Sequence, residues 1–296
     1  MQKKTALHGV AFGLSAYGMW GFFPLYFHQL SHVPAADIIS NRAVWGCLFV
    51  ALILLFTRQW RGAVTAARSS RALGLLATAM LLIGANWLVF MIAVERQQVV
   101  ASSLGYFLTP LVNVLLALVI LKERLNWKEW VAVGLAVVAV FNEILALGEL
   151  PWISLVLAAT FGTYGLVRKK IQVDVISGLF LETLLMLPLA VFYAAWQGRT
   201  GHVVFGGHDA STELLLALSG VLTALPLLAF AAAAQRLGLA ALGMLMYINP
   251  TLQFATAVLH FGEPLQPARL VTFGLIWLGL AVYSWSAWQK YRPATA

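Results

Sequence analysis

The sequence predicts an all-α integral membrane protein with ten transmembrane helices, arranged as two inverted five-helix repeats. Its composition, the spacing of its apolar runs and an internal repeat support this prediction. Hydrophobic residues make up 61% of the 296 residues and charged residues only 10%, with a mean hydropathy of +0.85. Soluble chains usually carry about 25% charged residues, so lipid must cover much of this apolar surface.

Ten apolar runs are long enough to cross a hydrocarbon core, which takes roughly 20 helical residues. They cover residues 7–28, 36–56, 72–94, 99–121, 128–147, 151–168, 175–196, 213–235, 238–261 and 268–288. The connections are short and hold most of the charge, and only 197–212 forms a longer polar loop. The first run lacks a small-x-small cleavage site, so we expect a retained helix rather than a signal peptide.

Lysine and arginine fall mainly on one side when these runs alternate across the membrane. With the N-terminus in the cytoplasm, 15 of the 19 basic residues lie in cytoplasmic segments. Arg96, Arg199 and Arg269 lie on the other side, and Arg42 lies within a span. The positive-inside rule therefore places both termini in the cytoplasm. The net charge of +8 reflects this topology, and we expect no nucleic-acid partner.

An internal repeat divides the chain into residues 1–147 and 148–296. A shift of 140 places Pro110 on Pro250 and Glu123 on Glu263, and a shift of 144 places residues 17–21 on the similar segment 161–165. Because each half has five spans, the second half enters the membrane in the opposite orientation. Inverted repeats with a site at their interface are a recurrent transporter architecture.

The fourth and ninth spans carry matching patterns at spacings of 3, 4 and 3, which place four residues on one helical face. The patterns are Ser103, Tyr106, Pro110 and Asn113, and Gly243, Met246, Pro250 and Gln253. Each proline frees a backbone carbonyl four residues earlier, and such groups are tolerated only against protein or water. We expect both faces to line a shared cavity. The alternative is a pair of packing kinks with hydrogen bonds between helices.

Aromatic side chains accompany these faces. The first span has Tyr17 and Trp20 on one stripe, with a further helix kink at Pro24. The sixth span offers Tyr164, and the third offers Asn86 and Trp87, which complete the predicted wall. An aromatic wall with few amides suits an amphipathic or aromatic solute. The alternative is that these rings belong to the interfacial aromatic belt.

Two ionisable residues lie inside spans, where charge is costly and faces protein or water. Arg42 and Glu182 lie about 9 and 10 Å into their spans, at 1.5 Å per residue, and they are equivalent at the shift of 140. Inversion separates them in depth, so a direct ion pair is not required. Arg42 suits a carboxylate or phosphate, and Glu182 suits a cationic group or proton coupling. The structural alternatives for Arg42 are snorkelling outward or pairing with Asp37.

The sequence contains few other residues or motifs that indicate binding, metal or catalytic sites. Glu123 and Glu263 close the fourth and ninth spans, where an acid opposes the helix dipole, so we expect each to form a structural clasp with a basic partner. The histidines show no metal spacing, and we expect neither a metal nor a cofactor. The sequence has no H-E-x-x-H, G-x-S-x-G or Walker motif and a single cysteine, which argues against an enzyme or an ATP-driven pump.

The same residues carry a resemblance to the RarD family, in the EamA group of the drug/metabolite transporter superfamily. The motifs that resemble it cover nearly the whole chain and are residues 16–27, 86–87, 101–110, 164–169, 182–188 and 247–251. The resemblance implies ten helices, two inverted EamA repeats, cytoplasmic termini and a bacterial inner membrane. Related superfamily members export amino acids and other metabolites. The chain departs from the usual pattern at Asn41, where a histidine usually precedes the arginine of the second span.

Together these observations predict a secondary transporter that moves a small metabolite or drug-like solute by alternating access, with export as the expected direction. The solute would be an amino acid or a related amphipathic compound. The partners would be this solute and membrane lipid, with proton coupling as a further hypothesis, and the protein would be a monomer or homodimer. The alternatives are a non-transporting sensor or assembly subunit and a membrane-embedded enzyme.

Overall fold

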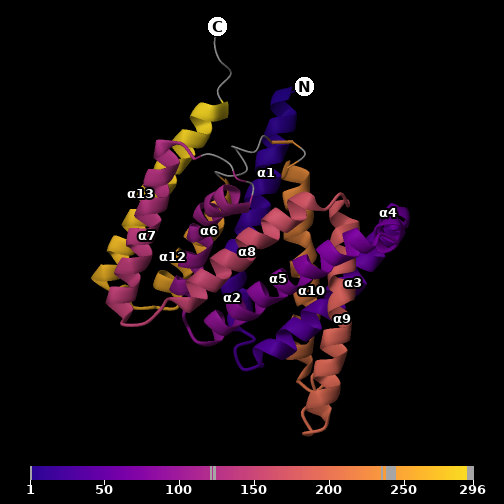
Figure 1. Ribbon diagram of the computed structural model, residues 1–296. Helices are drawn as coiled ribbons and strands as arrows, with labels where there is room; N and C mark the ends of the chain where they lie inside the picture. Colours follow the sequence, from indigo (N-terminus) through magenta and orange to yellow (C-terminus); the bar gives the residue numbers. More distant parts are fainter. Residues whose placement is uncertain (1, 121, 123–124, 235, 238–244, 292–296) are drawn as a thin grey trace.

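The computed structural model describes residues 2–120, 122, 125–234, 236–237 and 245–291 as a bundle of helices (Figure 1). The long helices are α1 (Gln2–Gly21), α3 (Ala35–Thr57), α5 (Ser70–Glu95), α6 (Val99–Ile120), α7 (Trp127–Leu147), α8 (Trp152–Lys170), α9 (Val175–Gly198), α10 (Ala210–Ala234) and α13 (Pro267–Tyr291). The shorter elements are α2 (Phe23–His28), α4 (Trp60–Ala67), α12 (Ile248–Ala255) and the π-helical turn η1 (Thr256–His260). Glu123 and Gly243 lie outside the described residues.

The helices follow the predicted apolar runs closely. The first run is divided at Phe22 into α1 and α2, and Pro24 occupies the first turn of α2. The described part of the ninth run is α12 followed by η1. By length and composition, seven helices in the described part of the chain can cross a membrane. The sequence did not predict α4, an extra helix in the connection between α3 and α5.

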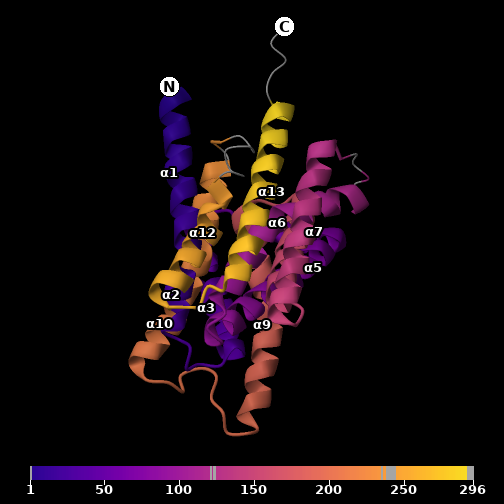
Figure 2. The same ribbon diagram turned by 90° about the vertical axis from the view of Figure 1, so that its left-hand side faces the viewer.

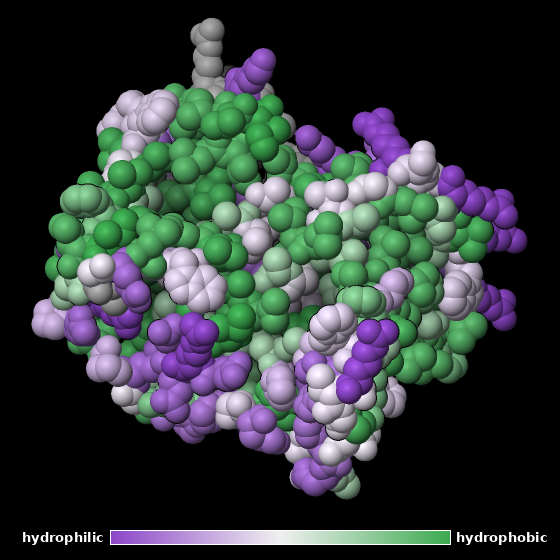
Figure 3. Space-filling model, turned by 60° about the horizontal axis from the view of Figure 1, so that its bottom comes forward, coloured by the Kyte–Doolittle hydropathy of each residue, from purple (hydrophilic) through white to green (hydrophobic). Residues whose placement is uncertain are grey.

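The surface of the bundle is largely hydrophobic. Figure 3 shows apolar residues over much of one face, with hydrophilic residues gathered in patches toward its rim and lower part. Large side chains such as Phe56 and Leu259 are 85% and 84% exposed. Water disfavours contiguous apolar surface of this extent, whereas lipid chains cover it without cost. The protein is therefore a multi-pass membrane protein.

The two ends of the chain approach the same end of the bundle. The start of α1 and the end of α13 both lie at the top of the bundle in two perpendicular views (Figures 1 and 2). The loop between α9 and α10 lies at the opposite end in both views. This arrangement agrees with an even number of crossings.

Each helix of residues 1–147 has a predicted equivalent in residues 148–296. When equivalent helices are exchanged, several contacting helix pairs correspond to other contacting pairs. Helices α6 and α8 pack together, as do their equivalents α12 and α1. The same holds for α5 with α8 and α10 with α1, and for α3 with α10 and α9 with α5. The pairs α3–α9, α6–α12 and α7–α13 are their own counterparts, and all three are in contact.

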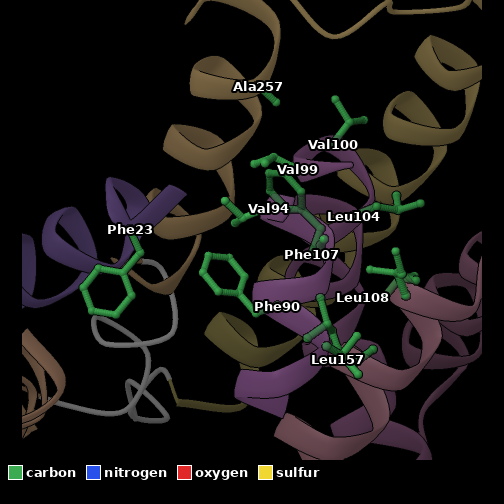
Figure 4. Packing of buried hydrophobic residues seen from close by; sticks show 14 of the residues in the cluster. Phe23, Phe90, Val94, Val99, Val100, Leu104, Phe107, Leu108, Leu157 and Ala257 are labelled. Atoms are coloured by element: carbon green, nitrogen blue, oxygen red, sulfur yellow. The ribbon is translucent and has the colours of Figure 1, made fainter. Parts of the chain in front are cut away.

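The largest apolar cluster lies where α2, α5, α6, α8 and α13 meet. Phe27, Phe107 and Phe273 are almost fully buried in it, together with Phe90 and Leu157 (Figure 4). Phe27 and Phe90 meet edge to face at 6.3 Å, and Phe107 and Phe273 do so at 6.0 Å. This cluster fixes α5 and α6, which carry several of the predicted site residues.

Candidate functional site

Arg42 lies within α3 and is only 3% exposed. Its Nε donates a hydrogen bond to the hydroxyl of Thr223 on α10 at 2.6 Å, and that hydroxyl donates to the carbonyl of Ser219 at 2.8 Å. Neither terminal amino group of the guanidinium donates to another described residue, and no described carboxylate lies within 4.0 Å. Arg42 is therefore a buried cation with free donors, which proteins retain where an anion or water binds.

Aromatic rings surround this guanidinium. Its central carbon lies 4.0 Å from the centroid of the Trp87 ring, 5.3 Å from that of Phe27 and 5.6 Å from that of Phe23. Tyr106 also lies close enough to interact with the charge. Each cation–π contact contributes about 0.5 to 2 kcal/mol, depending on its desolvation. The rings stabilise the charge without neutralising it, because they bring no negative group.

Two glycines bring α3 and α10 close enough for the contact between Arg42 and Thr223. A Cβ atom on Gly220 would lie 2.4 Å from the backbone nitrogen of Gly46, which no ordinary side chain permits. Gly46 follows Arg42 by about one turn of α3, and Gly220 precedes Thr223 by about one turn of α10. The close backbone approach therefore sets the hydroxyl opposite the guanidinium.

Glu182 on α9 forms a second polar centre, and it has a charge partner. Its Oε1 accepts a hydrogen bond from Nη1 of Arg168 at 3.0 Å, and its Oε2 accepts one from the hydroxyl of Tyr164 at 3.2 Å. The Glu182 side chain is only 3% exposed. Gly178 makes room for the arginine, because a Cβ there would lie 2.3 Å from Nη1. The carboxylate is thus held by α8 and does not reach Arg42.

Asn86 joins three helices. Its Nδ2 donates to the carbonyl of Leu157 at 3.1 Å and to the hydroxyl of Thr160 at 2.9 Å, both on α8. Its Oδ1 accepts a hydrogen bond from the hydroxyl of Tyr106 on α6 at 3.1 Å. The amide is 1% exposed, so these bonds use its polar groups within the protein. Asn86 fixes the ring of Tyr106 beside Arg42 rather than offering a free amide.

The proline-bearing faces of the fourth and ninth runs meet each other. The hydroxyl of Ser103 on α6 donates to the carbonyl of Pro250 on α12 at 2.8 Å. Beside it, Gln253 accepts from the hydroxyl of Ser102 at 3.2 Å and donates to Oδ1 of Asn249 at 2.9 Å. Pro110 lies within α6, two turns after Ser103. At this crossing the polar side chains form hydrogen bonds between α6 and α12, which was the alternative to a shared cavity.

The remaining predicted residues form no hydrogen bond or cation–π contact with Arg42 in the described part of the chain. Tyr17 is 5% exposed and packs edge to face against Trp20 at 5.6 Å, and both rings approach Phe230 on α10. Asn113 is exposed and has no hydrogen bond among the described residues. The structure thus brings Trp87 and Tyr106 to Arg42, groups Tyr164 with Glu182, and leaves Asn113 outside both groups.

Asp37 contacts the long loop between α9 and α10, and the sequence did not predict its partners. Asp37 is fully buried and accepts from the hydroxyl of Tyr193 at 2.7 Å, while Nε2 of His202, on the loop, lies 2.6 Å from its other oxygen. The alternative in which Asp37 neutralises Arg42 is therefore not realised.

Glu263 caps the start of α6. Its carboxylate accepts the backbone N–H groups of Val99 at 2.6 Å and Val100 at 2.9 Å. Its direct partners are thus amides, where we expected a basic side chain. Burial raises the pKa of Glu263, and the two amides oppose that shift because they favour the charged form. An acid at a helix N-terminus complements the dipole, so the clasp is electrostatically favourable.

Sequence reasoning missed Thr223 and the role of Phe23. A signal for Thr223 exists, because Ser219, Gly220 and Thr223 form a small polar stripe on one face of an apolar helix. Phe23 carries no such signal, since one phenylalanine among many apolar residues has no distinguishing pattern. No group of three metal-ligating side chains occurs in the described part of the chain.

Comparison with known proteins defines the class. The EamA-like transporter family matches residues 7–142. An uncharacterized transporter of Vibrio cholerae is 42% identical over 95% of this chain and 93% of its own. A solved crystal structure of a protein shares 17% identity and a TM-score of 0.59, covering 93% of this chain and 96% of that one, which shows the same fold. The protein is a multi-pass inner-membrane transporter.

The family follows from relatives that bear its name. The RarD proteins of Salmonella typhi and Escherichia coli are 42% and 40% identical to this chain, each over 99% of both sequences. The chain belongs to the RarD family of the drug/metabolite transporter superfamily.

Proposed function

We propose that this transporter is a secondary carrier that exports a small amphipathic solute with a carboxylate group, such as an amino acid, by alternating access. The single observation that carries this proposal is the buried guanidinium of Arg42, whose terminal amino groups have no partner in the described part of the chain. A guanidinium binds a carboxylate through two parallel hydrogen bonds. The neighbouring rings of Trp87 and Tyr106 suit the apolar part of such a solute.

Alternating access requires two halves that exchange conformations. The proposed halves are residues 1–147 and 148–296, each contributing five of ten crossings. The packing pairs that survive exchange of the halves support this division, because a symmetric pattern allows each half to adopt the arrangement of the other. In this topology both termini are cytoplasmic, and the protein acts as a monomer or homodimer.

A carrier also needs an energy source. Glu182 is the candidate for proton coupling, since it is the buried carboxylate at the position equivalent to Arg42. Protonation would release Arg168 and Tyr164 and so loosen the contact between α8 and α9. Transport into proteoliposomes with and without an imposed pH gradient tests this part, because equal rates would reject proton coupling.

Binding and transport are tested in sequence. A thermal-shift screen of the purified protein against amino acids, nucleosides, amines and chloramphenicol identifies a solute, and the methyl ester of any carboxylate hit provides a matched neutral analogue. We expect the acid, and not the ester, to raise the melting temperature. Counterflow of that acid in proteoliposomes then establishes transport. Binding without counterflow would instead support a sensor, and a screen in which only amines or esters bind would reject the anion site.

A further inference from the structure

A cavity of about 550 Å³ lies outside the Arg42 site, between α4, the start of α5 and the connection from α8 to α9. Its polar lining includes Arg61, Ser69, Arg71, Lys170, Gln172 and Asp174. Figure 1 shows α4 at the right-hand edge of the bundle. The cavity joins the two sequence halves, because α4 and α5 belong to the first and the α8–α9 connection belongs to the second.

The charges around this cavity are unbalanced. Arg61, Arg71 and Lys170 line it, and none forms an ion pair within 4.0 Å in the described part of the chain. The one carboxylate in the lining, Asp174, accepts the backbone N–H of Ser177 at 2.9 Å and so caps the start of α9. Three unpaired cations converging on a hollow favour an anion with several acceptor oxygens, such as a phosphate group.

The position of α4 indicates a lipid as the source of that phosphate. The helix buries Ala63 and Ala66 against the bundle, and the Trp60 ring meets Phe180 edge to face at 5.4 Å. A short amphipathic helix with an aromatic anchor beside basic residues is typical of a segment lying in the membrane interface. Basic pockets at this depth bind lipid headgroups. Leu75 and Val173 add apolar surface to the lining of the same cavity.

We propose that this cavity binds the phosphate group of an anionic phospholipid through Arg61, Arg71 and Lys170. The bound lipid connects α4 and α5 with the α8–α9 connection and so stabilises the arrangement in which the two halves are in contact at this face. The site is independent of the solute site, because none of its polar residues belongs to the Arg42 or Glu182 groups.

The test compares lipids and matched variants. The purified protein in detergent is titrated with phosphatidylglycerol, with zwitterionic phosphatidylcholine and with inorganic phosphate, while the melting temperature is followed. The variant Arg61→Gln/Arg71→Gln removes two cavity charges. The variant Arg58→Gln/Arg68→Gln removes the same charge from the flanks of α4, outside the cavity lining.

We expect phosphatidylglycerol to raise the melting temperature of the wild type and of the flank variant, and the cavity variant to bind it about tenfold more weakly or worse. Equal responses of the two variants would overturn the proposal, since they would indicate general surface attraction. An equal shift with inorganic phosphate alone would overturn the lipid assignment. If the cavity variant fails to fold, Lys170→Gln is tested in its place. Unchanged binding of phosphatidylglycerol by the Lys170→Gln variant would overturn the proposal.

Discussion

Arg42 and Glu182 occupy equivalent positions in the predicted repeat, yet their surroundings differ. The carboxylate of Glu182 is satisfied from within, by Arg168 at 3.0 Å and by the hydroxyl of Tyr164 at 3.2 Å. The guanidinium of Arg42 has one hydroxyl and three aromatic rings but no anion. One position therefore holds an ion pair, and the other holds a cation with no carboxylate partner in the described part of the chain.

This difference indicates separate roles for Arg42 and Glu182. A buried ion pair with both partners present is costly to break, so it ties α8 to α9. A buried cation without a carboxylate partner gains stability when an anion binds, so in the proposed function Arg42 provides binding energy for the solute. Substitutions at each position separate these two roles.

Glu182→Leu should destabilise the protein most, by roughly 3 kcal/mol, because it leaves the partly buried Arg168 without its carboxylate. The melting temperature in detergent micelles measures this loss. Replacing both partners, as in Glu182→Leu/Arg168→Leu, should restore much of the stability. A double variant no more stable than the single one would show that the pair is not a structural tie.

Arg42→Gln should weaken binding of a carboxylate solute by about 100-fold, because charged hydrogen bonds contribute roughly 1.5 to 3 kcal/mol each. Stability should fall far less than in Glu182→Leu, because no carboxylate is left unpaired. Isothermal titration with the acid found in the screen measures the affinity. Unchanged affinity in a folded Arg42→Gln protein would exclude this guanidinium from the site.

Trp87→Leu should weaken binding of the same solute by about 3- to 30-fold, because the Trp87 ring positions the Arg42 guanidinium through a cation–π contact worth about 0.5 to 2 kcal/mol. The ring also forms part of the wall for the apolar portion of the solute. Trp87→Phe keeps an aromatic face and should retain most of the affinity. Equal losses in the two variants would show that bulk, rather than the ring face, matters.

Asn113→Ala should have the smallest effect, within about 0.5 kcal/mol in stability and without a change in solute affinity. The side chain is exposed and makes no hydrogen bond in the described part of the chain. Thermal unfolding and titration of this variant beside Arg42→Gln provide the comparison. A loss of affinity here would place the solute path along α6, far from the Arg42 group.

Much of the fold follows from the sequence because each membrane span is a local feature. A run of about 20 apolar residues must satisfy its own backbone, and a helix does so without help from neighbours. The helix ends therefore fall within a few residues of the predicted runs. The amphipathic α4 was missed because its eight residues are too short to produce a clear periodic signal.

The site was only partly predictable, because the composition of a span shows that a charge is buried but not what it meets. Arg42 and Glu182 stood out because charge inside a span is rare. The sequence did not show which residues they contact, since Thr223 and Trp87 are far from Arg42 along the chain. Asn86 and Gln253 looked like free amides in the sequence, and packing alone revealed that their hydrogen bonds go to neighbouring helices.

The membrane location, the course of the helices and the spans that hold Arg42 and Glu182 follow from the sequence alone, because lipid penalises every exposed polar group in the same local way. Only the tertiary structure decided which charge is paired. Close approach of α3 and α10 at Gly46 and Gly220 gave Arg42 a hydroxyl, and space beside Gly178 gave Glu182 an arginine. Such contacts depend on distances between helices, which no single span encodes.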